Sequence, residues 1–312
     1  MLMIKIKKYT SDDSREWDRI IEKSRSGTFL HYRNYMDYHS DRFKDFSLII
    51  SRAEKPVAVF PATVVFDTVH SHAGLTYGGL FSLESLCADD ALQTFHEIGK
   101  YYREQGMKKV IVKSIPYPFY RYPCQEDLYA LFRVGAKLTR RDASSVLALN
   151  AEFKYSKGRK WSINKARKAG VVVKKTSNPM RFHELLTGVL KKFETTPTHS
   201  LAELILLMSR FPDNILLYEA EISGNLLAGT IIYDFGDIVH TQYLATSDGG
   251  RDVGALDFLI SDLIEDVYPM RKYFSFGVST EQQGIYLNTG LIAHKEGFGA
   301  RTVVHDFYEW IL

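Results

Sequence analysis

The order of predicted elements repeats once along the chain, and this repeat is the strongest constraint on the fold. Residues 47–80 contain three extended runs, with a tight turn at Glu54–Pro56 between the first two. Residues 215–250 repeat the same order, with turns at Ser223–Asn225 and at Gly236–Asp237. A period of this length indicates two duplicated domains rather than a solenoid of short repeats.

The elements that follow these runs match as well. A helix at 91–105 precedes the strand KKVIVKS, and a helix at 255–267 precedes the strand RKYFSFG. Each half then has a further helix, QEDLYALF or QQGIYLNTGL, and a closing strand, SSVLAL or TVVHDFYEW. Helices are also expected before the first long strand of each half, at 12–24, 31–43, 180–193 and 199–210. We therefore predict a mixed α/β fold with two domains, 1–152 and 153–312, that form a cleft.

Composition excludes several classes of protein. Hydrophobic residues make up 45% of the 312 residues and charged residues 25%, which is typical of a globular protein. The only cysteines, Cys87 and Cys124, show neither a disulfide framework nor metal-ligand spacing. No carboxylate or cysteine pattern completes a zinc site around His70 and His72, so no metal is expected. The longest apolar run, 57–66, is too short to span a membrane, and the amino terminus does not resemble a signal peptide, so we expect a cytoplasmic protein.

Positive charge is concentrated in one stretch. Ten of the 40 Lys and Arg residues lie between Phe153 and His183, where there is no Asp or Glu, which leaves 30 against 37 acidic residues elsewhere. The same stretch is predicted to form a helix with four side chains available for burial, namely Trp161, Ile163, Ala166 and Ala169. Such a run is either a solvated helix face or the binding surface of an anionic partner, such as a nucleotide, a nucleic acid or a lipid-linked sugar. The candidate binding residues are Arg159, Lys160, Arg167 and Lys168.

The tandem arrangement, with a basic helix between the halves, resembles the Fem family of aminoacyl- and acyltransferases, whose halves have the GNAT fold. The resemblance covers nearly the whole chain. Its most specific pieces are GRKWSINKARKAGVVVKK, which is similar to the family's RxxIxKAxKxGV stretch, FSFG, which is similar to a recurring DFG, and KEGFGA, which is similar to KxxFG. It implies an enzyme that transfers an acyl group to an amine, with acyl-CoA or aminoacyl-tRNA as donor.

The resemblance makes the stretch ATSDGGRDVGAL a candidate donor site. GNAT proteins hold the pyrophosphate of coenzyme A with the amides of a Q/R-x-x-G-x-G/A loop, and Arg251 and Gly254 match its first and fourth positions. Leu256 departs from the last position, which puts the usual binding mode in doubt. The cofactor-binding candidates are Gly249, Gly250, Arg251, Gly254 and Ala255, before a helix expected to begin near Asp252. The alternative is a well-capped turn with no ligand.

Few side chains are available for the chemistry, which in such enzymes is mostly positioning, proton removal and oxyanion stabilisation. Lys295 matches the family's lysine and is a candidate for stabilising the oxyanion or the donor phosphates; otherwise it is a surface lysine. Tyr243 is a candidate proton donor to the leaving group, or a core residue. Alternation along a strand places His240 and Gln242 on one face, opposite Tyr243, as candidate acceptor contacts. No general base can be assigned from the sequence.

Three functions remain open. The first is a Fem-type acyl- or aminoacyltransferase acting on an amine of a cell-envelope precursor or a polysaccharide sugar. The second is a coenzyme A-dependent N-acetyltransferase of a small amine, and the third is a non-catalytic binding module with the same fold. The expected partners are a small-molecule or lipid-linked sugar substrate and tRNA, but not DNA. The sequence contains no long charged helical hairpin, so a tRNA would have to bind the basic face of residues 154–181.

Overall fold

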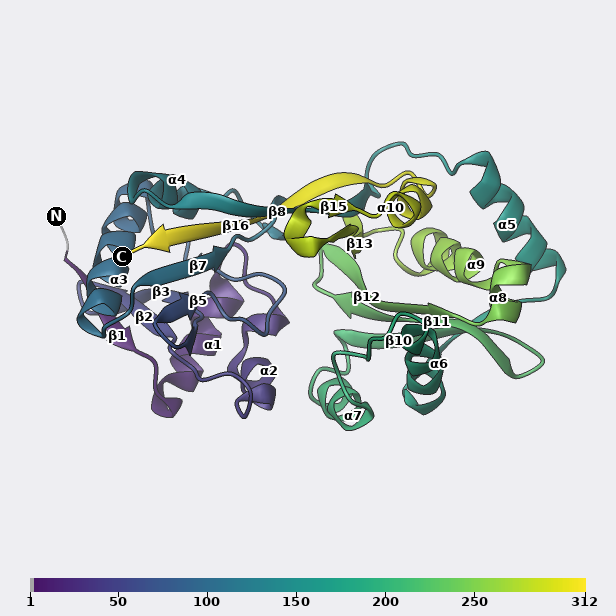
Figure 1. Ribbon diagram of the computed structural model, residues 1–312, viewed down its shortest axis with the longest axis horizontal. Coiled ribbons are helices and arrows are strands. Elements are labelled where there is room, and N and C mark those ends of the chain that lie inside the picture. The colour runs from purple at the N-terminus through teal and green to yellow at the C-terminus, as the bar shows by residue number, and fades with distance from the viewer. Residues whose placement is uncertain (1–2) are drawn as a thin grey trace. The chain divides into compact units, whose positions relative to one another are not determined.

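The computed structural model describes residues 3–312, which pack into two compact units (Figure 1). Unit 1 takes the chain up to Asp142 together with Gln282–Ile285 and Val304–Leu312. Unit 2 consists of Ala143–Glu281 and Tyr286–Val303. Both contain helices packed on mixed sheets, so the predicted mixed α/β class is confirmed.

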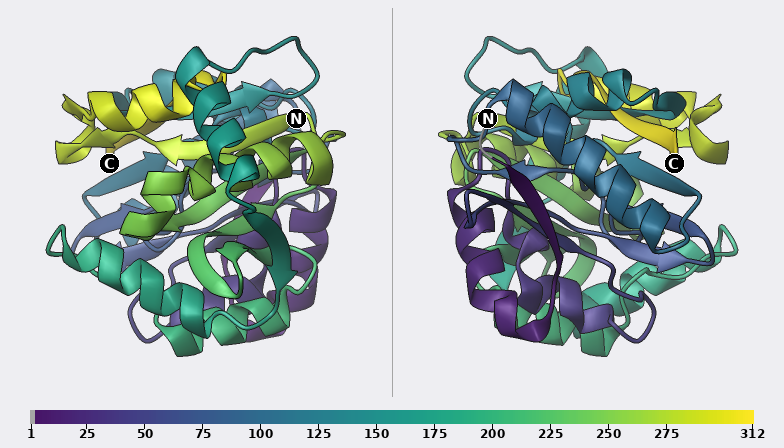
Figure 2. Two further views of the ribbon diagram at one scale, coloured as in Figure 1. Left: turned by 90° about the vertical axis from the view of Figure 1, so that its right-hand side faces the viewer. Right: turned by 90° about the vertical axis from the view of Figure 1, so that its left-hand side faces the viewer.

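Unit 1 is built on two sets of strands. Its helices and strands are β1 (Ile4–Lys8), α1 (Ser14–Lys23), α2 (Arg33–Met36), β2 (Leu48–Arg52), β3 (Lys55–Phe60), β4 (Thr63–Val65), β5 (Thr68–His70), β6 (Phe81–Ser82), α3 (Ala88–Glu104), β7 (Lys109–Lys113) and α4 (Glu126–Arg133). Strands β1, β2, β3 and β6 form an antiparallel sheet in that order. Strand β4 pairs antiparallel with β5, and β5 pairs parallel with β7. Helix α3 packs on β1 and α4 (Figure 2).

Unit 2 repeats this plan around a longer meander. Its elements are α5 (Lys157–Lys168), β9 (Val172–Thr176), α6 (Met180–Lys191), α7 (Leu201–Arg210), β10 (Ile215–Ile222), β11 (Asn225–Asp234), β12 (Ile238–Thr246), α8 (Asp248–Val253), α9 (Ala255–Asp262), β13 (Tyr273–Val278), β14 (Thr280–Glu281), β15 (Tyr286–Leu287) and α10 (Thr289–Glu296). Strands β9 to β12 are antiparallel neighbours in sequence order, and β12 pairs parallel with β13. The first hairpins of both units turn through residues with positive φ, Ala53–Glu54 and Ser223–Gly224.

The closing strand of each half of the sequence pairs with a strand of the other half. The long strands β8 (Lys137–Ala148) and β16 (Arg301–Ile311) end the two halves of the sequence. Yet β16 pairs with β7 of unit 1, whereas β8 pairs with β13 of unit 2. Trp310 of β16 enters the core of unit 1 beside Phe95, and a Cβ atom at Gly99 of α3 would lie 2.6 Å from its ring. One cut in the sequence therefore cannot separate the packed units, and the division into domains 1–152 and 153–312 stays a prediction.

Two predicted helices differ from those in the structure. The segment 31–43 holds only the short α2 between two 3-10 turns. The segment 282–291, predicted as a helix, begins with a 3-10 turn in which Gln282 and Gln283 have positive φ, continues as β15 and becomes helical only at Thr289. Asn288 causes this late start because its side chain accepts a hydrogen bond from the amide of Leu291 and so caps α10.

Candidate functional site

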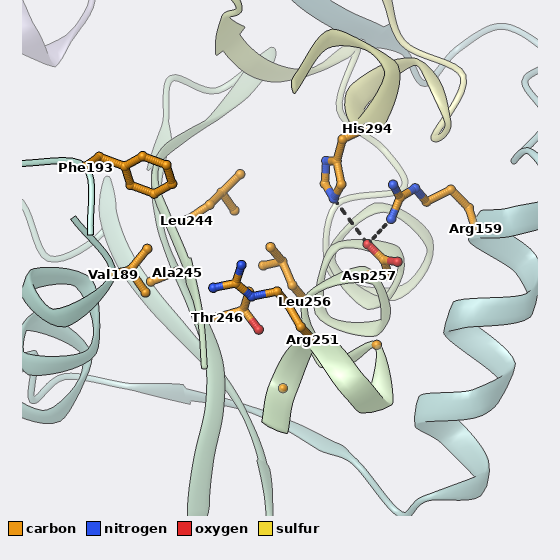
Figure 3. A pocket seen from close by; sticks show the side chains of 12 residues that line it. Arg159, Val189, Phe193, Leu244, Ala245, Thr246, Arg251, Leu256, Asp257 and His294 are labelled. Carbon is orange, nitrogen blue, oxygen red and sulfur yellow. Dashed lines mark hydrogen bonds and ion pairs between the residues drawn. The ribbon is translucent and has the colours of Figure 1, made fainter. Parts of the chain in front are cut away.

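Unit 2 contains a pocket at the junction of α8 and α9, with a volume of about 450 Å³ (Figure 3). Its walls come from the end of β12, the α8–α9 junction, the end of α6 and single residues of α5 and α10. The lining residues are Arg159, Val189, Phe193, Leu244, Ala245, Thr246, Gly250, Arg251, Gly254, Leu256, Asp257 and His294. One wall is therefore apolar, and the others carry charged side chains.

The stretch predicted as a glycine loop is helical. Helix α8 begins at Asp248, and Ser247 caps it by accepting a hydrogen bond from the amide of Gly250 at 3.0 Å. Asp252, predicted to start the helix, lies inside α8. Gly254 then breaks the helix with φ +81°, and α9 begins at the buried Ala255. The prediction of a single helix from near Asp252 is wrong because the Ser247 cap starts the first turn earlier.

Packing alone accounts for two of the glycines. A Cβ atom at Gly250 would collide with the carbonyl of Leu227 and lie 2.6 Å from the hydroxyl of Thr246. A Cβ atom at Gly254 would lie 2.7 Å from the carbonyl oxygen of Ser162 on α5, in addition to the strain of its positive φ. Neither glycine needs a ligand to explain it. Gly249 is exposed and does not line the pocket, whereas Gly250 and Gly254 do.

Arg251 is the side chain of this stretch that is best placed for an anion. It lies on α8 and is about half exposed, and its guanidinium extends into the pocket beside Leu256 (Figure 3). Arg251 forms an ion pair with Asp248 at 3.3 Å. The same Asp248 carboxylate also binds Lys192 at 2.9 Å. An exposed pair of this kind holds a guanidinium only weakly, so Arg251 is able to turn to a bound phosphate.

A partly buried cluster of three side chains lies on the opposite wall, and no sequence pattern predicts it. Arg159 of α5 and Nε2 of His294 on α10 both bind the Asp257 carboxylate, the latter at 3.3 Å (Figure 3). Burial alone would raise the pKa of Asp257, but hydrogen bonds from His294 and Ser162 and the charge of Arg159 outweigh it and lower that pKa to about 2. Asp257 lies in the first turn of α9. The amino end of that helix therefore already holds a carboxylate.

The basic stretch forms helix α5, which packs on α9 with one face and exposes the other (Figure 2). Of its four candidate binding residues only Arg159 reaches the pocket. Lys160 and Lys168 are exposed, and Arg167, which is exposed too, places its guanidinium 5.8 Å from the ring centroid of Phe258 on α9. Ile163 and Ala166 are buried as predicted, but Trp161 is 67% exposed and Ala169 is exposed too. The prediction that these two are buried is wrong because only one narrow apolar stripe of the helix meets α9.

Lys295 is turned away from this pocket. It is 2% exposed, and its ammonium donates hydrogen bonds to the carbonyls of Gly277 and Val278 and to the hydroxyl of Ser279, at 2.7–2.9 Å. Burial lowers its pKa to about 8. All three of its protons therefore have acceptors at the end of β13, which makes Lys295 a clamp between α10 and that strand.

A β-bulge changes the predicted faces of β12. Thr241 pairs with Ile232 and Tyr243 with Ile231, so Gln242 is the extra residue. The side chain of Gln242 hydrogen-bonds the Tyr243 hydroxyl, and the prediction that the two lie on opposite faces is therefore wrong.

Tyr243 and His240 of β12 form hydrogen bonds with other residues of unit 2. The Tyr243 hydroxyl lies 2.6 Å from Nδ1 of His199 and accepts a hydrogen bond from the backbone amide of the same histidine. His240 lies across β13, with Nδ1 3.0 Å from the Ser275 hydroxyl. Pairing between β12 and β13 extends only from Ile238–Tyr273 to His240–Ser275, so the rest of β12 has its second edge open toward the pocket.

Comparison with known proteins identifies the fold. No protein-family model matches the sequence, and no curated protein matches it either. Among solved structures, FemX has a TM-score of 0.69 at 11% identity, with 99% of this chain and 97% of that chain covered. The chain has a Fem/GNAT-like fold. The lysylphosphatidylglycerol synthase L-PGS from Bacillus licheniformis matches with a TM-score of 0.64 at 12% identity, covering 96% and 92%. A tandem GNAT protein from the clavulanic acid biosynthesis pathway matches with 0.54 at 10%, covering 98% of each chain.

Two further observations concern metals and membranes. Within residues 3–312, no group of three or more His, Cys, Asp or Glu side chains is arranged to hold a metal ion. Across the same residues, none of the helices has the length and apolarity needed to cross a bilayer.

Proposed function

We propose that this protein is an N-acyltransferase that moves an acyl or aminoacyl group from an activated donor to an amine. The observation that carries the proposal is the open edge of β12, which leads into a pocket with cationic side chains on opposite walls. Unpaired backbone groups at such an edge can hydrogen-bond an extended donor, and Arg251 can bind its phosphate. Transfer then needs mainly correct placement of the amine and the carbonyl.

The details of the pocket favour an aminoacyl-tRNA as donor. Coenzyme A in the usual GNAT mode would place its pyrophosphate on the amides that begin α9. There Leu256 lines the pocket, and Asp257 puts a carboxylate, ionised at neutral pH, at the helix end. A pyrophosphate at that place would meet both steric hindrance and like charge. A tRNA end needs only Arg251 in the pocket, and its phosphates can follow the exposed lysines of α5.

The acceptor is proposed to be an amine on a cell-envelope precursor or a polysaccharide sugar, presented as a small molecule or linked to a lipid. The similarity in fold to FemX and to a lysylphosphatidylglycerol synthase supports this class. A coenzyme A-dependent N-acetyltransferase is the second candidate, because Arg251 and Gly254 keep the spacing of the GNAT loop and both line the pocket.

A thermal-shift experiment separates these candidates, because a ligand that binds the folded state raises its melting temperature. The probes are coenzyme A, acetyl-coenzyme A, uncharged tRNA and bulk aminoacyl-tRNA. We expect aminoacyl-tRNA to raise the melting temperature of the wild type and of Arg15→Glu, an exposed control in unit 1, but not of Arg251→Glu. A shift with acetyl-coenzyme A alone would establish the second candidate. No shift with any probe would reject an acyl donor site.

A further inference from the structure

The hydrogen bonds of His294 determine which of its ring nitrogens carries the proton. Its Nε2 atom lies 3.3 Å from Oδ1 of Asp257, which is ionised at neutral pH because its pKa is about 2. An ionised carboxylate only accepts hydrogen bonds, so in the neutral form of the ring the proton is on Nε2. The other nitrogen, Nδ1, is therefore left with its lone pair.

This lone pair belongs to a side chain on the pocket wall. His294 lines the pocket, and in Figure 3 a dashed line joins one nitrogen of its ring to the Asp257 carboxylate. The ring is also held edge-to-face by Phe298, with centroids 5.6 Å apart. Asp257 and Phe298 together fix the orientation of the imidazole.

The charged groups around His294 favour a proton-accepting role. Asp257 on α9 carries a negative charge that would stabilise an imidazolium, and Arg159 on α5 binds the same carboxylate. Arg251 on α8 is the cation across the pocket, and Lys295, the next residue in α10, is turned toward β13. Among the residues that line the pocket, the arginines hold protons at all relevant pH values and Asp257 is paired, so His294 is the group suited to accept one.

We infer that His294 is the general base of the transfer reaction, with Asp257 as the residue that positions it; this inference rests on the proposed function. The acceptor ammonium gives a proton to Nδ1, and the freed nitrogen lone pair forms a bond to the donor carbonyl carbon. The tetrahedral intermediate collapses, the bond from that carbon to the ribose oxygen of the tRNA breaks, and the imidazolium returns its proton to this oxygen. The amine loses its second proton to solvent water, and His294 ends as it began.

The first test needs no substrate. In protein labelled with ¹⁵N-histidine, long-range proton–nitrogen correlation spectra distinguish the two neutral tautomers of each imidazole. We expect the signal lost in His294→Gln to be that of an Nε2-protonated ring in the wild type. We expect Asp257→Asn, whose amide can donate to Nε2, to shift this ring toward the Nδ1-protonated form. An Nδ1-protonated His294 in the wild type would overturn the inference.

The second test measures catalysis with bulk aminoacyl-tRNA as donor and glucosamine as amine, in single turnovers between pH 5.5 and 8.5. We expect His294→Gln to lose roughly 100-fold or more in rate together with one ionisation of the pH profile, while the melting-temperature shift with aminoacyl-tRNA persists. His96→Gln, which changes an exposed histidine of α3, should keep both the rate and the profile. If aminoacyl-tRNA does not bind the wild type, the proposed function fails and the role of His294 fails with it. If the donor binds and His294→Gln keeps the wild-type rate, only the assignment of His294 fails.

Discussion

Replacing Lys295 by Met tests whether the lysine that resembles a catalytic residue is instead a clamp within the fold. The ammonium makes three hydrogen bonds at the end of β13, two to carbonyls and one to the Ser279 hydroxyl. Hydrogen bonds to a charged group contribute about 1.5–3 kcal/mol each. The Met side chain fills the space of the lysine stem but cannot donate.

Part of this loss is returned because a buried ammonium is costly. Burial lowers the pKa of Lys295 from 10.5 to about 8, which corresponds to about 3 kcal/mol. The net destabilisation expected for Lys295→Met is therefore about 2–6 kcal/mol, or a fall in melting temperature of roughly 4–24 °C for a unit of this size. Lys154→Met is the control, because Lys154 and its partner Glu152 are both about 80% exposed and such pairs contribute little.

The pH dependence provides an independent measurement. The lysine of the unfolded chain keeps its proton up to about pH 10.5, whereas folded Lys295 releases it near pH 8. Between these values the unfolded state binds more protons, so the free energy of unfolding of the wild type should rise with pH relative to Lys295→Met, by about 3 kcal/mol. Calorimetry of both proteins from pH 7.5 to 10.5 measures this difference. The clamp would be refuted if the wild type and Lys295→Met had equal melting temperatures and the difference between them did not change with pH. If Lys295→Met lost only aminoacyl-tRNA binding, Lys295 would be a ligand-binding residue instead.

Three further variants test the α8–α9 turn, the α8 cap and the basic face of α5. Gly254→Ala should lower stability by about 1–3 kcal/mol in thermal melts, because φ is +81° and Ser162 blocks the added Cβ; an unchanged melting temperature would contradict the packing argument. Ser247→Ala should lower the free energy of unfolding by about 1 kcal/mol, because the α8 cap is lost. An unchanged free energy of unfolding in denaturant would show that the cap does not stabilise the protein. Reversing three exposed charges of α5 should weaken tRNA binding and reduce its salt dependence by about 2–3 units of the log–log slope, with little change in melting temperature. The reversed residues are Lys160, Arg167 and Lys168. A slope equal to that of the wild type would show that tRNA does not bind this face of α5.

The repeat was predictable because local sequence patterns indicate each of its elements. Both hairpins have short turns between apolar runs, and the helices before β7 and β13 have clear amphipathic spacing. The exchange of β8 and β16 was not predictable, because no local pattern in either closing strand specifies the sheet that it joins. Only long-range packing, such as that of Trp310 against Gly99, determines the partner of β16.

The candidate site was harder to predict for four physical reasons. Helix α8 contains two glycines, which disfavour helix, so its formation depends on the Ser247 cap and on the fit of Gly250 against β11. Lysine is rarely buried completely, so Lys295 would not be expected in the interior. The Asp257–His294 pair joins residues from helices far apart in the sequence, and neither belongs to a recognisable motif. The bulge at Gln242 likewise leaves no pattern, because it only adds one residue to a strand.

The two units also show why similar topologies need not carry similar sites. In unit 1 the helix after the meander is α3, whose first turn holds the carboxylates of Asp89 and Asp90. Asp90 binds Arg52 of β2, so the charges at that helix end are balanced within the unit. In unit 2 the corresponding helix α9 also carries a carboxylate, but a pocket adjoins it, and Arg251 approaches from the other wall. An anion that enters unit 2 meets Arg251, whose ion pair with Asp248 is exposed and easily exchanged for a ligand. We therefore propose that the donor binds in unit 2, and expect changes at Arg52 to affect stability but not ligand affinity.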